Sequence, residues 1–300
     1  MQKLFYPFLI IFAASCYGIL STIIKLAIHD GFTASQAVTS QYYIGFAITL
    51  VIFAVTKRNI PQFKGGKILL LGGLFTATTG TVYGQAVEYM PASLAVVMLF
   101  QFTWIGMLFD SIAKKRLPNR SELLSLVFLF GGTILAAGVI DVDLSVIPWQ
   151  GWLFGLASAV SFSSFMMVNQ KQVEGLDTTT RLLFTSLFAA FFISIFQSPE
   201  IIWDGTLLSG GLWKYGAILG LFGVVIPIYL FSTAVPKVGA GTASILSAME
   251  LPVAITASML LLGEKLTSLQ FVGIFIILFG MTLPTLVDMH RERKKRFNTT

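Results

Sequence analysis

The chain has 300 residues, of which 55% are hydrophobic and only 11% charged, and its formal net charge is +6. Because soluble chains carry about 25% charged residues, this sequence has too little charge to coat a globular surface of its size. The composition therefore excludes an ordinary soluble enzyme, a disordered chain and a nucleic-acid-binding module. It predicts a polytopic membrane protein whose outer surface faces lipid.

Residues suited to disulfides or metal binding are scarce. Cys16 is the one cysteine, which excludes an internal disulfide framework. The two histidines, His29 and His290, lie in polar stretches beside charged residues. Since a zinc site needs three or four convergent ligands, we expect neither a metal nor any other cofactor.

Apolar stretches of membrane-spanning length recur along the whole chain. An α-helix needs about 20 apolar residues to cross a hydrocarbon core of about 30 Å. Short connections containing Pro, Gly, Asn and charged residues separate the stretches and leave no room for a soluble domain. We therefore expect an all-α integral membrane protein with ten transmembrane helices, at roughly 4–24, 34–56, 68–87, 93–113, 121–140, 149–170, 181–198, 213–234, 241–262 and 268–287.

The basic residues fall almost entirely on one side of this arrangement. The side with the N-terminus, the even-numbered loops and the C-terminus holds 17 of the 20 Lys and Arg residues, and the other side holds Lys25, Lys214 and Lys265. The positive-inside rule then predicts that both termini are cytoplasmic. The net charge of +6 mostly records this topology and does not point to an acidic partner.

The two ends of the chain need separate interpretation. Lys3 and an apolar run before Cys16 imitate a lipoprotein signal, but the run continues to Ile24, so we expect a retained span. The basic segment 291–296 is expected to lie against anionic lipid in the cytoplasm.

A weak internal repeat appears when the chain is shifted against itself by about 149 residues. Residues 129–133 then fall on 278–282, and Gln101 falls on Glu250. Each half holds five spans, and an odd number makes the second half enter the membrane from the opposite side. We therefore predict two inverted five-helix repeats, at 1–145 and 146–290, and a tail at 291–300. Inverted repeats suit alternating access around a midplane site, although chance similarity between apolar helices is the competing interpretation.

The second half resembles a known family. The segment Glu250–Leu251–Pro252, then 262–266 and the glycines Gly273 and Gly280, is similar to the end of an EamA repeat of the drug/metabolite transporter superfamily. Residues 90–93 are similar to the start of the same element in the first half. The resemblance covers nearly the whole chain. It implies a bacterial inner-membrane carrier of small metabolites, often amino acids and often an exporter.

The first half departs from that pattern. Lys115 and Arg116 stand where the second half has Glu264 and Lys265. Residues 101–103 replace Glu250–Leu251–Pro252, and Gln41 stands where such repeats often carry an arginine.

Glu250 is the strongest single candidate for function. It lies about ten residues into the ninth span, where a charge costs roughly 2.5–3.5 kcal/mol to insert. A carboxyl in a low dielectric favours its protonated form, so Glu250 is predicted to bind substrate, to couple transport to protons, or to pair with a cationic substrate. The alternative is a structural role for a protonated side chain bonded to a neighbouring helix.

Other side chains could line the same cavity. Tyr17 and Phe162 occupy related positions in the two halves beside small residues, and could hold an apolar ring or a cation between them. Core packing is the alternative for each aromatic residue. The full set of predicted substrate-binding residues is Tyr17, Tyr43, Tyr83, Gln85, Gln101, Trp104, Phe162, Tyr229 and Glu250.

Glycines and prolines indicate how the helices pack and bend. Small residues recur every fourth position from 72 to 84 along the third span, a pattern that allows close helix contact. Pro227 and Pro252 remove backbone donors and are predicted hinges in spans eight and nine.

These features favour a secondary transporter that moves a small metabolite by alternating access. Its substrate could be an amino acid, another zwitterion, a quaternary amine or a nucleobase-like molecule. A multidrug or lipophilic-cation efflux carrier is the main alternative, and a channel or scramblase is another. The sequence shows no phosphate-binding loop or intramembrane catalytic cluster, so we expect no enzyme activity. The expected partners are substrate and membrane lipid, with protons as a candidate coupling ion and no nucleic acid, in a monomer or homodimer.

Overall fold

The structure is a computed structural model that describes residues 2–57, 61–90, 92–136, 146–263 and 267–297. Within those ranges every regular element is helical and none is a strand. The predicted pair Glu264 and Lys265, the junction at residue 145 and the last three residues of the predicted tail lie outside them.

The described residues of the first half form seven helices. The first predicted span is covered by α1 and α2, the fourth by α5 and α6, and single helices cover the others. Their bounds are α1 (Gln2–Gly18), α2 (Leu20–His29), α3 (Ala34–Lys57), α4 (Gly66–Tyr89), α5 (Ala92–Leu99), α6 (Phe102–Lys114) and α7 (Arg120–Ala136).

The second half is also helical, with short 3-10 or π segments interrupting it. The eighth predicted span comprises α10, η4 and α11, and the ninth comprises α12, η5 and α13. The bounds are α8 (Trp149–Gln170), α9 (Thr178–Phe196), η3 (Pro199–Ile202), α10 (Trp213–Gly220), η4 (Leu221–Val225), α11 (Ile226–Val238), α12 (Ala240–Leu246), η5 (Ser247–Met249), α13 (Glu250–Leu262) and α14 (Ser268–Phe297).

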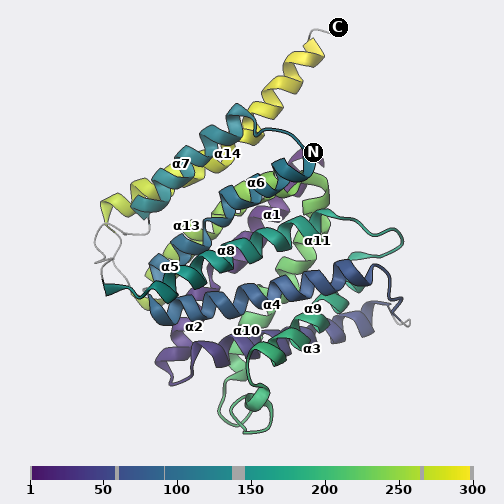
Figure 1. The fold of residues 1–300 in the computed structure, drawn as a ribbon, viewed down its shortest axis with the longest axis vertical. Helices are drawn as coiled ribbons and strands as arrows, with labels where there is room; N and C mark the ends of the chain where they lie inside the picture. Colours follow the sequence, from purple (N-terminus) through teal and green to yellow (C-terminus); the bar gives the residue numbers. More distant parts are fainter. Residues whose placement is uncertain (1, 58–60, 91, 137–145, 264–266, 298–300) are drawn as a thin grey trace.

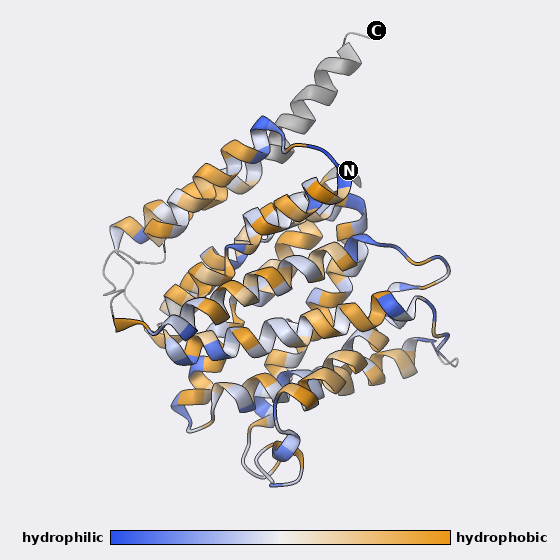
Figure 2. Ribbon diagram, viewed as in Figure 1, coloured by the Kyte–Doolittle hydropathy of each residue, from blue (hydrophilic) through white to orange (hydrophobic). Residues whose placement is uncertain are grey.

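Seven helical stretches of the described chain are long and apolar enough to cross a membrane, and Ser268–Leu283 is a shorter apolar helix. Helix α4 falls outside this set because its second half is rich in Gly and Thr, and α7 has only 17 residues. Figure 2 shows apolar residues along most of the helices, and large apolar side chains such as Phe8, Leu260 and Phe275 are 61–71% exposed. So much exposed apolar surface identifies a multi-pass membrane protein.

The helices pack as two related sets (Figure 1). Helix α4 contacts α8 and α9, and the corresponding helices of the other half, α11 and α10, contact α1 and α3. Likewise α6 contacts α8, and α13 contacts α1. Helices α3 and α9, α6 and α12, and α7 and α14 pack across the two halves. Each main contact made by one of the first five predicted spans therefore has a counterpart among the contacts of the last five.

Successive predicted spans run in alternating directions between two ends of the bundle (Figure 1). One end of the bundle, where α3 ends and α9 begins, is called here the basic end. There Lys57 pairs with Asp177 at 3.2 Å, and this ion pair joins the end of α3 to the start of α9. At the opposite end, the hydroxyl of Tyr215 donates to Asp30, which joins α10 to the end of α2. This alternation is what a chain threaded back and forth across a bilayer requires.

Asp177 also starts α9 at the basic end. Its carboxylate accepts hydrogen bonds from the backbone N–H groups of Thr179 and Thr180, both at 3.1 Å, as an N-cap residue does. Partial burial raises the pKa of Asp177, but the hydrogen bonds from Thr180 and Lys57 outweigh burial and hold the pKa below its ordinary value of 3.8.

Irregular turns precede both predicted hinge prolines. The π segment η4 ends two residues before Pro227, whose ring would clash with the carbonyl of residue 223 in a continuous α-helix. The 3-10 segment η5 comes directly before Glu250 and Pro252. In the first half, α5 and α6 separate at Phe100 and Gln101, which the 149-residue shift places on Met249 and Glu250.

Candidate functional site

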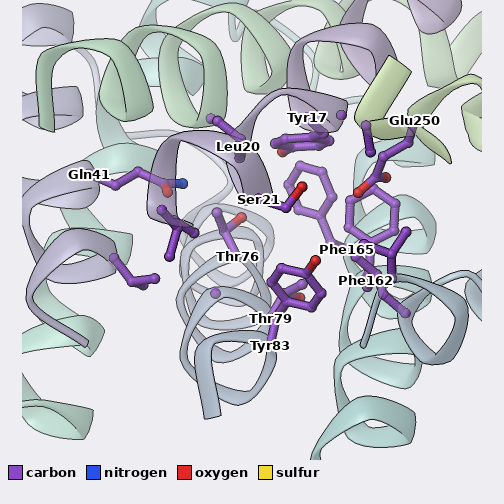
Figure 3. A pocket seen from close by; sticks show the side chains of 18 of the residues that line it. Tyr17, Leu20, Ser21, Gln41, Thr76, Thr79, Tyr83, Phe162, Phe165 and Glu250 are labelled. Carbon is purple, nitrogen blue, oxygen red and sulfur yellow. The ribbon is translucent and has the colours of Figure 1, made fainter. Parts of the chain in front are cut away.

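A cavity lies between the two halves (Figure 3). Its volume is about 80 Å³, room for several waters at about 10–15 Å³ each. Helices α1, α2, α3, α4, α5, α8 and α13 and the π segment η4 contribute to its wall. The lining residues are Tyr17, Gly18, Leu20, Ser21, Ile24, Val38, Gln41, Tyr42, Thr76, Thr79, Gly80, Tyr83, Val96, Leu99, Phe162, Phe165, Gly223, Glu250 and Ala254.

Glu250 is the charged member of this wall. It is the first residue of α13, at the point where η5 ends, and its exposed fraction is 9%. Its Oε2 atom is buried and has no hydrogen-bond partner among the described residues. Figure 3 shows the carboxyl group pointing toward the rings of Phe162 and Phe165. A buried carboxyl without a partner is costly, so its position calls for a ligand or a proton.

Close helix packing at Gly18 brings Tyr17 next to Glu250. A Cβ at Gly18 would lie 2.5 Å from the backbone oxygen of Glu250 and 2.8 Å from Cβ of Val253. Only glycine permits this approach of α1 to α13. Gly18, the small residue beside Tyr17 in the sequence, therefore determines where the Tyr17 ring lies in the cavity.

Five aromatic rings contact one another in and beside the cavity wall. The ring of Tyr17 lies 5.6 Å from Phe162 and stacks on Phe231 at 5.8 Å. Phe162 also contacts Phe102 at 4.7 Å and Phe165 at 6.0 Å. Tyr17 is half-buried and the four phenylalanines are buried. These five residues are called here the aromatic cluster, and three of them, Tyr17, Phe162 and Phe165, belong to the cavity wall.

The wall opposite Glu250 is polar. Gln41 lies across the cavity from Glu250 (Figure 3), and Gly223 in η4 leaves room for its amide, because a Cβ there would lie 2.5 Å from Nε2. The Tyr42 hydroxyl donates to the carbonyl of Thr76 at 2.7 Å. Thr79 donates to the Ser161 hydroxyl at 2.9 Å.

The structure places the predicted site residues in two groups. Tyr17, Tyr83, Phe162 and Glu250 line the cavity. The other five do not, namely Tyr43, Gln85, Gln101, Trp104 and Tyr229.

Contacts explain most of the second group. The Tyr43 hydroxyl bonds to that of Ser194 at 2.7 Å, on another face of α3 from Tyr42. The Trp104 indole N–H donates to Gln101 at 2.9 Å, so these two residues bond to each other at the start of α6. Tyr229 is 41% exposed on the outside of α11.

Several lining residues were not predicted as substrate-binding from the sequence. Thr76 and Gly80 belong to the small-residue stripe of α4, which was interpreted as a packing surface. The stripe does pack, because a Cβ at Gly80 would collide with the Tyr42 hydroxyl. The same small side chains also leave space for the cavity. The polar side chains of Thr76 and Thr79 within an apolar span were the feature of the sequence that could have indicated a cavity wall.

A second buried carboxylate, Asp110, lies at the basic end and is 1% exposed. It pairs with Lys114 at 2.8 Å and Arg116 at 3.2 Å and accepts a hydrogen bond from Gln170 at 3.3 Å. Arg116 also pairs with Glu122 at 3.0 Å. These five residues, called here the charged network, join α6, α7 and α8 beyond the aromatic cluster.

The cavity wall carries little charge. Glu250 is the one lining residue with a formal charge in the described chain. No group of three or more His, Cys, Asp or Glu side chains that could hold a metal ion occurs among the residues searched. The cavity thus combines one carboxyl, aromatic faces and neutral hydrogen-bonding groups.

Comparison with known proteins gives one family and a set of distant relatives. The sequence model of the EamA-like transporter family matches residues 4–138 and 149–286. The triose phosphate/phosphate translocator of Flaveria trinervia chloroplasts is 19% identical over 214 residues, and that of Spinacia oleracea is 20% identical over the same length. Each alignment covers 68% of this chain and 53% of the translocator, so the chain spans about half the length of these curated relatives.

The fold has a counterpart among solved structures. One crystal structure superimposes with a TM-score of 0.73 at 15% identity, and the match covers 93% of this chain and 98% of the other. At that level of identity, the similarity establishes a shared fold.

Proposed function

Because the chain belongs to the EamA-like transporter family, we propose that it moves a small metabolite across a bacterial cytoplasmic membrane by alternating access around the Glu250 cavity. The observation that carries the proposal is a buried carboxyl without a partner in a cavity between two related halves. The family is one of transporters, and we propose no enzymatic role. Export of an amino acid, another zwitterion or an organic cation is the proposed activity.

Two inverted five-helix repeats supply the movement. The proposed repeats are 1–145 and 146–290, followed by the basic tail 291–300. The paired helix contacts and the two ranges matched by the family model support this division. Two related halves can exchange conformations and thereby open the same site to either side.

The described conformation is proposed to be closed toward the cytoplasm. Both termini and the basic end are assigned to the cytoplasmic side by the distribution of Lys and Arg. The aromatic cluster and the charged network would then be two successive barriers below the cavity. Opening to the cytoplasm requires the rings around Phe162 to separate and the contacts of Asp110 to break or move with one half.

Glu250 is proposed to couple transport to protons. The titratable side chains that share the cavity wall are Tyr17, Tyr42 and Tyr83, and none of them carries a basic charge. A cation that binds next to Glu250 favours the ionised carboxylate and displaces its proton. The turns before Pro227 and Pro252 are proposed as the hinges, because irregular backbone lies where each helix must bend.

Efflux of lipophilic cations is the second candidate function, because the carboxyl among aromatic rings also suits such molecules. A channel has less support, since the sequence offers neither repeated carboxylates nor a carbonyl filter around a pore. Substrate, protons and membrane lipid are the proposed partners, without nucleic acid, in a monomer or a homodimer.

The test is exchange of candidate substrates in proteoliposomes with and without a pH gradient. Wild-type protein should catalyse exchange that the gradient accelerates, and Glu250→Gln should abolish exchange under both conditions. Glu88→Gln removes an exposed acid of α4 and serves as the control. Full and equally pH-dependent exchange by Glu250→Gln would exclude the coupling role.

A further inference from the structure

We propose that the cavity selects an organic monocation, a small amine with an aromatic or apolar body, over phosphate, carboxylate or zwitterionic solutes. This inference rests on the proposed transport function and narrows it, because at the same site it keeps the organic cation as substrate and removes the amino acids and other zwitterions proposed above. It is carried by the charge, the ring arrangement and the unsatisfied hydrogen-bonding capacity of the cavity wall.

The first step is the sign of the charge. Glu250 is the charged lining residue, and no Lys, Arg or His lines the described cavity. Lys25 follows the lining residue Ile24 in the chain but does not itself belong to the wall. Anions in buried sites are held by Arg, Lys or clustered N–H donors. An anion placed here would instead face a carboxyl group in a low dielectric, which is unfavourable.

The second step is the surroundings of the carboxyl group. Oε2 of Glu250 is buried and accepts no hydrogen bond from the described residues, so it can accept one from a ligand. Asp110 provides the contrast within the same chain, since two basic side chains and an amide already satisfy it. The charge of Asp110 is balanced by the protein, and that of Glu250 is available to balance a ligand.

The third step is the aromatic wall. The rings of Tyr17, Phe162 and Phe165 lie beside the Glu250 carboxyl group (Figure 3). Ring faces attract ammonium groups, and the attraction strengthens when water is excluded. The same rings offer apolar surface for the rest of the molecule. An ammonium group next to Glu250 would therefore gain from the carboxylate and the rings together.

The far wall argues against a second ionic group on the ligand. Gln41, Ser21 and Thr79 can form hydrogen bonds there but carry no charge. The carboxylate of a zwitterion would lose its hydration without a cationic partner. The two similar translocators are named for triose phosphate and phosphate, and this cavity lacks basic side chains for such anions.

The experiment uses the purified full-length chain in detergent and compounds of matched shape. Equilibrium binding is measured for phenethylamine, phenylalanine and 3-phenylpropionate, which are a cation, a zwitterion and an anion around the same ring, and for inorganic phosphate. Phenethylamine should bind at least tenfold more tightly than each of the other three. Comparable or tighter binding of phenylalanine, 3-phenylpropionate or phosphate, or no saturable binding of phenethylamine, would overturn the proposal.

A variant pair tests the residue assignment. Glu250→Gln should weaken phenethylamine binding by about tenfold or more, because it removes one partner of a buried charge pair, and Glu88→Gln should leave binding unchanged. If Glu250→Gln does not give folded protein, the ranking of the four compounds on the wild type still decides. Binding in detergent needs no transport, so amine binding without exchange in liposomes would remove the transport proposal alone. Exchange of phosphate in liposomes would contradict the proposed selectivity for a monocation and leave the transport proposal in place.

Discussion

Two buried carboxylates of this chain have opposite surroundings. Asp110 is held by Lys114, Arg116 and Gln170, whereas Oε2 of Glu250 has no partner among the described residues. Burial alone therefore does not identify a functional acid. A buried carboxylate with cationic partners is costly to disturb, whereas one without a partner costs stability as it stands.

The contrast predicts opposite effects on stability. Asp110→Asn should lower the unfolding temperature in detergent, with a loss of about 1–3 kcal/mol, because charge-assisted hydrogen bonds are removed. Glu250→Gln should leave that temperature unchanged or raise it, because an unpartnered carboxyl is replaced by a neutral amide of the same shape. A larger loss for Glu250→Gln than for Asp110→Asn would show that Glu250 is a structural residue.

The pair Tyr17 and Phe162 could be found from the sequence because the repeat relates their positions, and their rings do lie 5.6 Å apart. Tyr43 is a residue whose orientation could not be predicted from the sequence. Its neighbour Tyr42 lines the cavity, and successive residues of a helix differ by about 100° in direction. In an apolar helix surrounded by lipid and protein, hydropathy does not say which of two adjacent tyrosines faces inward.

At the scale of the elements, the all-helical membrane fold predicted from hydropathy is confirmed, whereas the turns inside the helices could not be predicted. Apolar runs define where a span lies, but η4 and η5 depend on how neighbouring helices pack around the prolines that follow. Glycines were better guides, because close approach requires them at specific crossings.

The crossing of α7 and α14 offers adjacent glycines with different surroundings. A Cβ at Gly132 would lie 2.8 Å from Cγ1 of Ile277 and 2.9 Å from the carbonyl oxygen of Gly273, whereas one at Gly131 would meet nothing within 4 Å. Gly132→Ala should destabilise the protein by about 1–3 kcal/mol. Gly131→Ala should be neutral or slightly stabilising. Thermal unfolding in detergent checks the pair, and equal effects would contradict the described crossing.

The π segment before Pro227 gives a second prediction for an element. Pro227→Ala restores a backbone donor and allows η4 to relax toward a regular α-helix. The unfolding temperature should stay the same or rise, and the rate of exchange in liposomes should fall several-fold if the turn is a hinge. An unchanged exchange rate would show that the turn before Pro227 is a static bend and not a hinge.

At the scale of the whole molecule, alternation of the connections between two ends agrees with the threading predicted from the distribution of basic residues. Orientation can be tested with single cysteines after the buried Cys16 is replaced by Ser. A membrane-impermeant maleimide added outside intact cells should label Ser209→Cys, at the opposite end, and leave Gln62→Cys, at the basic end, unlabelled. The reverse pattern would invert the assignment of the two sides.

The central claim is that Glu250 and its cavity carry a solute across the membrane. Solute counterflow tests it most directly, with labelled phenethylamine outside proteoliposomes that contain the unlabelled amine. The account predicts a transient accumulation of label with wild-type protein and with Glu88→Gln, and none with Glu250→Gln. Accumulation that persists undiminished in Glu250→Gln, or none with wild-type protein, would contradict it.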